Sequence, residues 1–295
     1  MRSLSIFLTG SSGFIGRNIF EQLGKKYIFY APSSKELDIT DFFSVESFMK
    51  NHKIDVVVHT AKVGGTRKNP NSAEIAEVNS RMFFNITRNE KYFNKMIFLG
   101  SGAEYDVSRS LKKVKEEQFD EVVPRDSYGF YKYVCSKYIE NSSKIVNLRL
   151  FGIYGKYEDY ELRFISNAIC KNILGLPITM RQNVFFDYVY IHDFVKIVDY
   201  FINNDCRYKF YNIGRGEKID FLTIARIINK ISSKRSKIVV KKPGLKNEYT
   251  CDNYRLMHEI TYLRFTDFEK TVKELYAWYK SINSSLSIKS FLVDK

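Results

Sequence analysis

Three glycines, spaced three residues apart near the start of the chain, constrain its fold more than any other feature. Residues 9–16 read T-G-S-S-G-F-I-G, directly after an apolar run and directly before a helical pattern. Gly10 allows a tight turn, Gly13 lets a pyrophosphate approach the backbone, and Gly16 lets the helix pack closely on the strand. The helix then presents unpaired N–H groups to the phosphates. This context predicts a dinucleotide-binding turn, whereas three glycines in a plain loop are the alternative.

The first half of the chain alternates between short apolar runs and amphipathic segments. Strands are predicted at residues 4–9, 27–30, 55–59, 96–99 and 145–150, and helices at 14–23, 41–50, 71–92 and 127–141. Continuous apolar strands separated by helices indicate a parallel sheet that is covered on both faces. The predicted fold class is therefore α/β, with a doubly wound parallel sheet of the Rossmann type.

The second half is less regular and predicts a smaller α/β lobe. A strand-like run at 187–191 and a helix at 193–202 are expected to return to the main sheet. We therefore assign residues 1–155 and about 186–204 to the dinucleotide-binding domain. Residues from about 156 to 185 and from 205 to 295 are assigned to an interleaved substrate-binding lobe.

Composition excludes several classes of function. No apolar run reaches the roughly 18–20 residues that cross a bilayer, and no signal-peptide pattern is present, so a cytoplasmic protein without a membrane partner is expected. The four cysteines are far apart and the four histidines form no paired motif, so neither a disulfide framework nor a metal site is expected. The net charge is +14, but the basic residues are spread along the chain, which favours an anionic small substrate over nucleic acid.

The end of the second predicted strand indicates which dinucleotide binds. NAD-binding proteins usually carry an acid there for the ribose 2′-hydroxyl. Here the segment reads A-P-S-S-K at 31–35, so Ser33, Ser34 and Lys35 can hold a 2′-phosphate. Glu36 follows directly and keeps NAD open as the alternative. The sequence favours NADP.

Tyr128 and Lys132 are candidate catalytic residues because they lie four residues apart, on one face of a predicted helix. A nearby ammonium lowers the pKa of a tyrosine from about 10 toward the working pH. Such a tyrosine can exchange a proton with a sugar carbonyl during hydride transfer, while the lysine also holds the nicotinamide ribose. Ser101 would lie at the carboxyl edge of the sheet, where its hydroxyl can polarise the carbonyl.

The Y-x-x-x-K spacing alone is weak evidence because it occurs three times. Tyr133/Lys137 lies deeper in the same predicted helix, and Tyr276/Lys280 lies far from the relevant strand. Only Tyr128 directly follows the P-R-D-S segment at which the helix begins. An ordinary aromatic residue at a helix start is the alternative interpretation.

Together these motifs resemble the extended short-chain dehydrogenase/reductase family, which contains nucleotide-sugar epimerases, dehydratases and reductases. The resemblance runs through nearly the whole chain. It includes E-L-D-I-T-D at 36–41, T-A-K-V-G-G at 60–65, R-L-F-G-I-Y-G at 149–155, D-Y-V-Y-I-H-D at 187–193 and Y-N-I-G at 211–214. The A-K-V-G-G segment is similar to that of GDP-L-fucose synthase-like reductases. The family is usually a dimer through its two long helices, so the resemblance implies a homodimer.

The glycine turn, the second strand and the resemblance together imply a set of cofactor contacts. These are Gly10, Ser12, Gly13, Phe14, Ile15, Gly16, Ser33, Ser34, Lys35, Asp38, Ile39, Ala61, Lys62, Asn79, Tyr128, Lys132 and Phe151. The resemblance implies that Asp38 contacts adenine, because it matches the family's acid with that role.

Departures from the family's patterns narrow the reaction. GDP-fucose synthases carry a catalytic Cys two positions after the serine, where this chain has Ala103, and their partner His has no counterpart near residues 161–164. Dehydratases carry an acidic pair directly after their Thr or Ser, where this chain has Gly102 and Ala103. Glu104 comes one residue late for that role. Double epimerisation and loss of water are therefore not expected.

The substrate side departs from the pattern as well. Phe186 stands where many relatives place an Arg for the substrate diphosphate, and Gly152 replaces a common Asn. Arg163 or Arg181 could take over that role, with a solvated surface position as the alternative for each. The implied substrate contacts are Val63, Gly64, Ser101, Gly102, Ala103, Arg163 and Arg181.

The remaining Ser/Tyr/Lys set predicts hydride transfer at one carbon. We expect NAD(P)H-dependent reduction at C4 of a nucleoside-diphosphate 4-keto-6-deoxy sugar, in the synthesis of surface polysaccharide. A nucleotide-sugar 4-epimerase with tightly bound NAD is one alternative. A non-catalytic NADP-binding regulatory protein is another.

Overall fold

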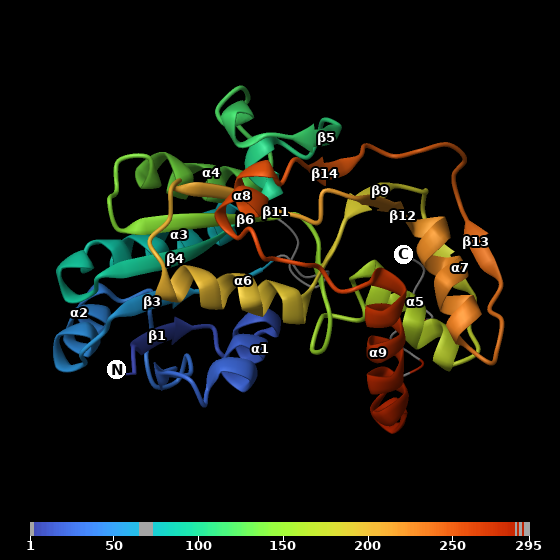
Figure 1. Cartoon of the computed structure of the whole chain (residues 1–295), viewed down its shortest axis with the longest axis horizontal. Helices are drawn as coiled ribbons and strands as arrows, with labels where there is room; N and C mark the ends of the chain where they lie inside the picture. Colours follow the sequence, from blue (N-terminus) through green and yellow to red (C-terminus); the bar gives the residue numbers. More distant parts are fainter. Residues whose placement is uncertain (1–2, 65–72, 287, 289–290, 292–295) are drawn as a thin grey trace.

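The computed structural model describes residues 3–64, 73–286, 288 and 291, and it contains a larger and a smaller lobe that lie side by side (Figure 1). The elements of the first half are β1 (Ser5–Thr9), α1 (Phe14–Leu23), β2 (Ile28–Tyr30), α2 (Phe42–Asn51), β3 (Val56–His59), α3 (Ala73–Thr87), η1 (Glu90–Tyr92), β4 (Lys95–Ser101), η2 (Gly102–Tyr105), β5 (Leu111–Val114), η3 (Glu116–Gln118), α4 (Ser127–Ile139), β6 (Ile145–Leu150) and β7 (Ile153–Tyr154). Those of the second half are α5 (Phe164–Ile173), β8 (Ile178–Met180), β9 (Phe185–Asp187), β10 (Val189–Tyr190), α6 (Ile191–Asn203), β11 (Phe210–Ile213), β12 (Lys218–Asp220), α7 (Phe221–Ile231), β13 (Ile238–Val240), β14 (Tyr249–Cys251), α8 (Tyr254–Glu259), α9 (Phe268–Ser281) and η4 (Asn283–Ser285).

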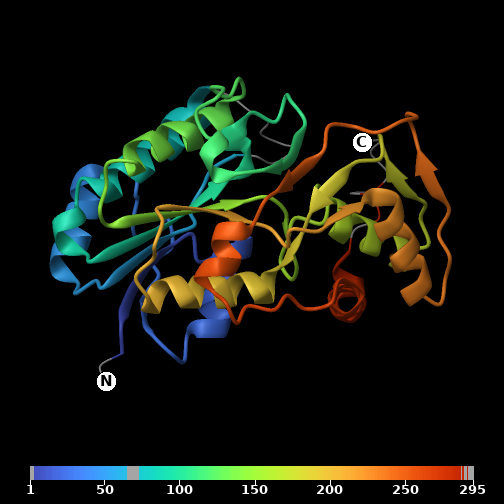
Figure 2. The same ribbon diagram turned by 45° about the horizontal axis from the view of Figure 1, so that its top comes forward.

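The larger lobe is built on a six-stranded parallel sheet in the order β11-β6-β4-β3-β1-β2. Every residue of β1 and of β3 is buried, as expected for strands covered on both faces. Helices α2, α3 and α4 cover one face, and α1 and α6 cover the other (Figure 2). The prediction of a doubly wound α/β fold is confirmed.

The chain leaves β1 toward one side of the sheet and returns through β3 on the other side, so the strand order reverses between them. Ligands of open α/β sheets bind outside the carboxyl ends of the strands at such a reversal. The carboxyl ends of β1, β3 and β4 are Thr9, His59 and Ser101. The fold therefore brings the glycine turn and Ser101 to the same edge.

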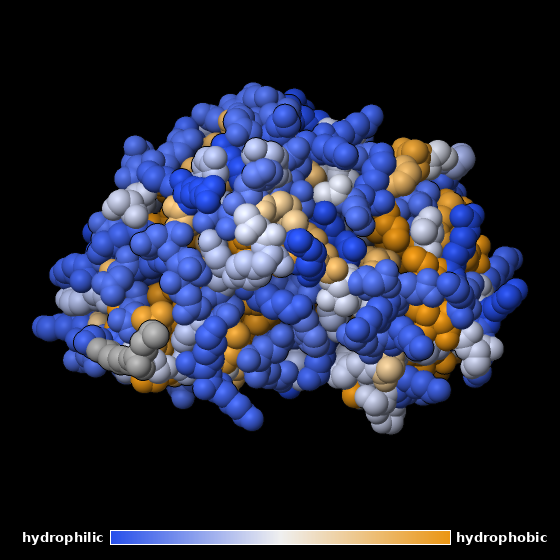
Figure 3. Space-filling model, in the orientation of Figure 1, coloured by the Kyte–Doolittle hydropathy of each residue, from blue (hydrophilic) through white to orange (hydrophobic). Residues whose placement is uncertain are grey.

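The smaller lobe packs α5, α7 and α9 against one another, with the short parallel pair β8 and β13 beside them. Its apolar residues belong to the same buried cluster as one face of the main sheet, so the two lobes share a core. Figure 3 shows hydrophilic residues over most of one side of the molecule, with hydrophobic residues gathered mainly on the smaller lobe at the right. Among the described helices, none is long and apolar enough to cross a membrane.

Several elements lie elsewhere than expected. β11 belongs to the main sheet, where it pairs with β6, although residues from about 205 onward were assigned to the second lobe. The run at 187–191 does not return to the main sheet, because it divides between β9, which pairs with β12 and β14, and β10, which pairs with β7. The helix expected at 71–92 ends at Thr87, because Asn89 leaves the helical conformation before η1. Residues 71 and 72 lie outside the described residues.

Candidate active site

A cleft of about 1500 Å³ runs along the carboxyl edge of the main sheet and continues into the smaller lobe. Its walls come from the glycine turn, the segments after β2, β3, β4 and β6, the start of α4, and the start of α5. The smaller lobe contributes β8, β9, the start of α7 and residues 242–249. The cleft is thus long enough to join a dinucleotide site to a second ligand site.

The glycine turn forms the floor of one end of the cleft. Gly10 has a φ of +72°, and a Cβ at this position would lie 2.7 Å from the backbone of Ala61. A Cβ on Gly16 would lie 2.2 Å from the Gly10 carbonyl oxygen, so neither position accepts a side chain. The first turn of α1 has no side-chain cap, which leaves its N–H groups free for phosphate oxygens. These features fit the pyrophosphate of a dinucleotide.

The next part of the cleft is lined by Ser33, Ser34 and Asp38. Glu36 turns away, because its Oε2 accepts a hydrogen bond from the Ser33 backbone N–H at 2.7 Å. This hydrogen bond lowers the pKa of the Glu36 carboxyl. Asp38 Oδ1 accepts from the backbone N–H and the hydroxyl of Thr40, at 2.8 and 2.7 Å. Glu36, the acid that left NAD as an alternative cofactor, is therefore engaged with the backbone of Ser33.

Most of the predicted cofactor contacts line the cleft. They are Gly10, Ser12, Gly13, Phe14, Ile15, Gly16, Ser33, Ser34, Asp38, Ile39, Ala61, Lys62, Tyr128, Lys132 and Phe151. Lys35 lies outside this lining. Asn79 also lies outside it and acts through the backbone, because its side chain forms hydrogen bonds of 2.9 and 3.0 Å with the N–H and C=O of Val63.

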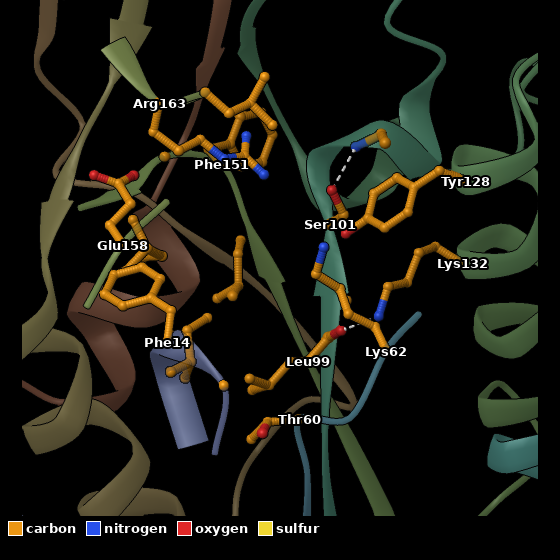
Figure 4. Close-up of a pocket in the computed structure, with 18 of the residues that line it drawn as sticks. Phe14, Thr60, Lys62, Leu99, Ser101, Tyr128, Lys132, Phe151, Glu158 and Arg163 are labelled. Carbon is orange, nitrogen blue, oxygen red and sulfur yellow. Dashed lines mark hydrogen bonds between the residues drawn. The ribbon is translucent and has the colours of Figure 1, made fainter. Parts of the chain in front are cut away.

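Ser101 and Tyr128 meet in the middle of the cleft (Figure 4). Ser101 ends β4, and its Oγ accepts a hydrogen bond from the Ala103 N–H at 3.1 Å. Burial raises the pKa of the Tyr128 phenol, while a hydrogen bond with Ser101 and the charge of Arg163 oppose that rise. The serine and the phenol are placed to share one oxygen atom of a ligand.

Lys132 lies one turn after Tyr128, and its ammonium donates to the Leu99 carbonyl (Figure 4). The Nζ atom is 6.0 Å from the centre of the Tyr128 ring and 4.3 Å from that of Phe98. Burial lowers the pKa of Lys132 to about 8. The predicted lowering of the Tyr128 pKa is therefore wrong for this arrangement, because burial dominates and the ammonium is bound to the backbone.

The two other Y-x-x-x-K pairs lie outside the cleft lining. The Tyr133 hydroxyl and the Lys137 ammonium both bind Asp120 at the surface. The Tyr276 hydroxyl donates to Asn172 at 2.9 Å, between helices of the smaller lobe. Of the three tyrosines with this spacing to a lysine, Tyr128 lines the cleft, and Tyr133 and Tyr276 do not.

A buried ion pair lies directly beneath Ser101. Glu104 Oε1 accepts from the Ser101 backbone N–H at 3.0 Å, and Glu104 Oε2 lies 2.6 Å from Arg149 Nε. Ser136, one turn after Lys132 on α4, donates its hydroxyl to Glu104 at 2.6 Å. Both charged side chains are fully buried. Glu104 is thus tied to β4, α4 and β6, and it lies outside the cleft lining.

Cations gather where the cleft passes from the sheet to the smaller lobe. Lys62, Arg163 and Arg181 line this part, together with Lys242 and Lys246. Within the described part of the chain, no carboxylate lies within 4.0 Å of the Arg163 guanidinium. Burial and the charge of Arg163 lower the pKa of Lys62. The cleft therefore attracts an anionic ligand.

The predicted substrate contacts divide in two. Val63, Ser101, Ala103, Arg163 and Arg181 line the cleft. Gly64 lies behind the wall against Ile75, and Gly102 is covered by Phe151 and Tyr249. Gly65, the last residue of the A-K-V-G-G segment, lies outside the described residues.

Glu158 is a cleft residue that the sequence did not single out. It lies opposite Ser101 and Tyr128, near Phe14 and Arg163 (Figure 4). Ser166 donates a hydrogen bond of 2.6 Å to its carboxyl group. Burial raises the pKa of Glu158 to about 8, so this carboxyl is neutral at pH 7. A lone Glu in an irregular segment carries no pattern that would have identified it.

Aromatic rings form the far wall of the cleft. Phe164 and Phe221 stack with ring centres 3.8 Å apart, and Phe186 lies 5.5 Å from Phe221. Phe186 also packs on Tyr249 at 5.2 Å. Phe186, which occupies the position where many relatives place an Arg, is thus part of an aromatic surface. The basic residues line other parts of the cleft.

Comparison with known proteins places this architecture in a family. The model of the NAD dependent epimerase/dehydratase family matches residues 6–214. A GDP-L-colitose synthase from Yersinia pseudotuberculosis is 26% identical over 264 residues, which cover 81% of this chain and 85% of that protein.

Solved structures share the fold. A GDP-mannoheptose C4 reductase from Campylobacter jejuni with NADP bound superposes with a TM-score of 0.77 and 18% identity, covering 95% of this chain and 99% of the other. A UDP-glucose 4-epimerase from Thermotoga maritima with UDP-glucose superposes with a TM-score of 0.80 and 19% identity, covering 95% and 99%. The chain belongs to the NAD-dependent epimerase/dehydratase family and is an NAD(P)-dependent enzyme of its nucleotide-sugar epimerases and reductases.

Proposed function

We propose that the enzyme reduces the C4 keto group of a nucleoside-diphosphate 4-keto-6-deoxy sugar and that NADPH is its reductant. The observation that carries this proposal is the reaction centre itself. Ser101 and Tyr128 meet in the cleft, whereas the next two positions are Gly102 and Ala103, which cannot transfer protons. The site thus has groups for protonating one oxygen atom and lacks the acidic pair and the Cys that the related dehydratases and synthases use.

The positions of the residues in the cleft give each of them a role in the reduction at C4. NADPH, held by residues such as Gly13, Ser33 and Lys132, would supply the hydride for C4, and the oxygen atom O4 would then need a proton. Tyr128 donates its phenol proton to O4, and the Ser101 hydroxyl donates a hydrogen bond to the same atom. Lys132, one turn further along α4 and also in the cleft, would hold the nicotinamide ribose.

The residues at the adenosine end support NADP over NAD. Ser33 and Ser34 offer two hydroxyl groups to a 2′-phosphate. A carboxylate that accepts from a 2′-hydroxyl is missing at the tip of β2, since Glu36 is bound to the Ser33 backbone. The nearby Asp38 is bound to Thr40.

The cations and the aromatic wall suit the two halves of a nucleotide sugar. Arg163, Arg181, Lys242 and Lys246 line the part of the cleft that leads into the smaller lobe, where a diphosphate would be neutralised. The rings of the aromatic wall offer apolar faces to the base or to the deoxygenated side of the sugar.

The test is consumption of NADPH with GDP-, CDP-, dTDP- and UDP-linked 4-keto-6-deoxy sugars. Net loss of NADPH with one of them supports a reductase and identifies the nucleotide. Protein that is purified with one equivalent of NAD, and that interconverts C4 epimers without net change in cofactor, would instead establish a 4-epimerase.

A further inference from the structure

Two ammonium groups lie beside Tyr128, and the Y-x-x-x-K spacing predicted one of them. The Nζ atom of Lys132 lies 6.0 Å from the centre of the Tyr128 ring, and the Nζ atom of Lys62 lies 5.8 Å from it. Lys132 comes from the same helix as Tyr128, whereas Lys62 belongs to the segment after β3. Packing between distant segments therefore adds a second cation to the reaction centre.

The Tyr128 oxygen needs cations nearby if it is to carry a negative charge. Burial raises the pKa of its phenol, and the carboxylates of Glu104 and Asp126 raise it further. Glu104 is paired with Arg149, and Asp126 caps α4 through the Gly129 N–H. A phenolate at this position is thus unfavourable unless a positive charge offsets both effects.

The Lys132 ammonium is already solvated by other groups of the protein. It donates a hydrogen bond to the Leu99 carbonyl, and Figure 4 shows it turned toward that residue. It also lies 4.3 Å from the ring centre of Phe98 and 4.8 Å from that of Tyr131. A cation that interacts with a carbonyl and two ring faces has less attraction left for a phenolate.

Lys62 approaches Tyr128 from the open side of the cleft. Its side chain is exposed and extends toward Ser101 and Tyr128 (Figure 4). Among the described residues its ammonium has one hydrogen-bonding partner, the Gly64 carbonyl at 3.3 Å. Because an ammonium has three protons to donate, Lys62 keeps donors for an anionic oxygen atom.

The backbone on either side of Lys62 is held in place. The Ala61 N–H donates to Thr9 Oγ1 at 3.3 Å. The Asn79 side chain binds both the N–H and the C=O of Val63, at 2.9 and 3.0 Å. These contacts join the segment to β1 and α3, so the fold determines the direction in which Lys62 leaves the backbone.

The charges in the cleft also favour an anion between the two lysines. Burial and the charge of Arg163 lower the pKa of Lys62, and the charge of Asp159 opposes that fall. Burial lowers the pKa of Lys132, and the charge of Lys62 adds to the effect. The two ammonium groups thus repel each other, and a negative charge on Tyr128, which lies beside both, would offset that repulsion.

We propose that Lys62 supplies the positive charge that stabilises the Tyr128 oxygen after this phenol has given its proton to O4. The substrate in this role rests on the proposed function, but the effect of Lys62 on the ionisation of Tyr128 exists without it. Because Lys62 acts through Tyr128, it is a positioning residue, and Lys132 is left to hold the nicotinamide ribose.

The first test measures the ionisation of Tyr128 without any substrate. Fluorotyrosine, whose phenol is more acidic than that of tyrosine, is incorporated into the full chain. The ¹⁹F resonance of residue 128 is identified by its loss in Tyr128→Phe. Lys62→Met keeps the length of the side chain and removes its charge, so the titration midpoint of this resonance should rise by about one pH unit.

Two variants control for other effects of the substitution. Lys62→Arg keeps the charge and should titrate close to the wild type. Lys25→Met, at an exposed residue outside the cleft lining, should also leave the midpoint of Tyr128 unchanged. A midpoint that stays constant in Lys62→Met, or that rises as far in Lys62→Arg or Lys25→Met, would overturn the proposal.

The second test separates this role from ligand binding. With a sugar that the enzyme accepts, Lys62→Met should lower kcat by up to about tenfold, because the phenol becomes a weaker acid by about one pKa unit. The KM values for NADPH and the sugar should stay near those of the wild type, and Lys62→Arg should restore most of kcat. Wild-type kcat with a raised KM would identify a lysine that only binds ligand and would overturn the proposal.

The two proposals can fail separately. An enzyme that consumes no NADPH overturns the proposed function, and the titration of Tyr128 still decides the role of Lys62. A reductase in which the Tyr128 midpoint does not respond to Lys62→Met keeps the proposed function and overturns the role of Lys62.

Discussion

Among single residues, the buried ion pair between Glu104 and Arg149 could not be predicted from the sequence. An Arg within the apolar strand pattern of β6 gave no reason to expect a partner 45 positions earlier in the chain. Ser101, Tyr128 and Lys132 could be selected from the sequence because a motif and a strand end marked them. Glu104 could not, because its contact with Arg149 joins distant segments, and Glu158 could not, because it lies in an irregular segment without a motif.

Breaking this ion pair should destabilise the fold strongly. Arg149→Met leaves the Glu104 carboxylate buried without its cation, which should lower the free energy of unfolding by about 3–5 kcal/mol. Arg81→Met, which breaks the exposed pair with Glu77, should cost about 1 kcal/mol or less. Chemical denaturation measures both losses. A loss at Arg149 no larger than that at Arg81 would contradict this prediction.

Glu158 should make stability depend on pH in a defined direction. Its pKa is raised from 4.5 to about 8 in the folded protein, so the folded state holds this proton more tightly than the unfolded state. The free energy of unfolding should therefore fall as pH rises from about 4.5 to about 8, by a few kcal/mol at most. Glu158→Gln cannot ionise and should lack this decline. Denaturation curves of the two proteins that keep a constant difference across this range would refute the assignment.

At the scale of elements, long periodic segments were predictable and short paired strands were not. α1 and β6 have the predicted bounds, because a local apolar pattern determines each of them. β5, β9 and β14 span three or four residues each. β5 and β14 pair across more than a hundred positions, and β9 pairs with β12 and β14 across more than thirty. Such strands lack a local signal, and the wall that carries Tyr249 was missed with them.

The start of α4 links local helix chemistry to the reaction centre. Asp126 caps this helix by accepting from the Gly129 N–H at 2.9 Å, two residues before Tyr128. Asp126→Ala should cost about 1 kcal/mol of stability and also reduce kcat, because it loosens the turn that holds Tyr128. Asp267→Ala removes the cap of α9, whose residues lie outside the cleft lining, and should cost similar stability with kcat unchanged. Equal kcat values in the two variants would show that the cap does not position Tyr128.

At the scale of the whole molecule, the lobes share one core, and the exposed apolar surface points to assembly. Tyr138 on α4 packs its ring on Phe83 and Phe84 of α3 and remains 36% exposed, and Phe130 on the same helix is 46% exposed. Exposed aromatic residues on a pair of packed helices are typical of a protein interface. This surface supports the predicted homodimer, which stays a prediction.

Light scattering after gel filtration tests the dimer. The wild-type chain is expected at twice its 34.7 kDa mass, and Phe130→Glu should shift it to the monomer because the charge would be buried in the interface. Phe43→Glu, at an exposed residue of α2, should leave the dimer intact. A monomeric wild type, or a dimeric Phe130→Glu variant, would place the interface elsewhere or remove it.

We propose that C4 of the sugar receives a hydride in this cleft and that O4 receives a proton from Tyr128. The most direct measurement is the loss of NADPH absorbance with each nucleotide-linked 4-keto-6-deoxy sugar, for the wild type and for Tyr128→Phe. We predict net oxidation of NADPH with one sugar, and a rate lower by about 10²–10⁴-fold in the variant. No loss with any sugar, or full turnover by Tyr128→Phe, would contradict the claim.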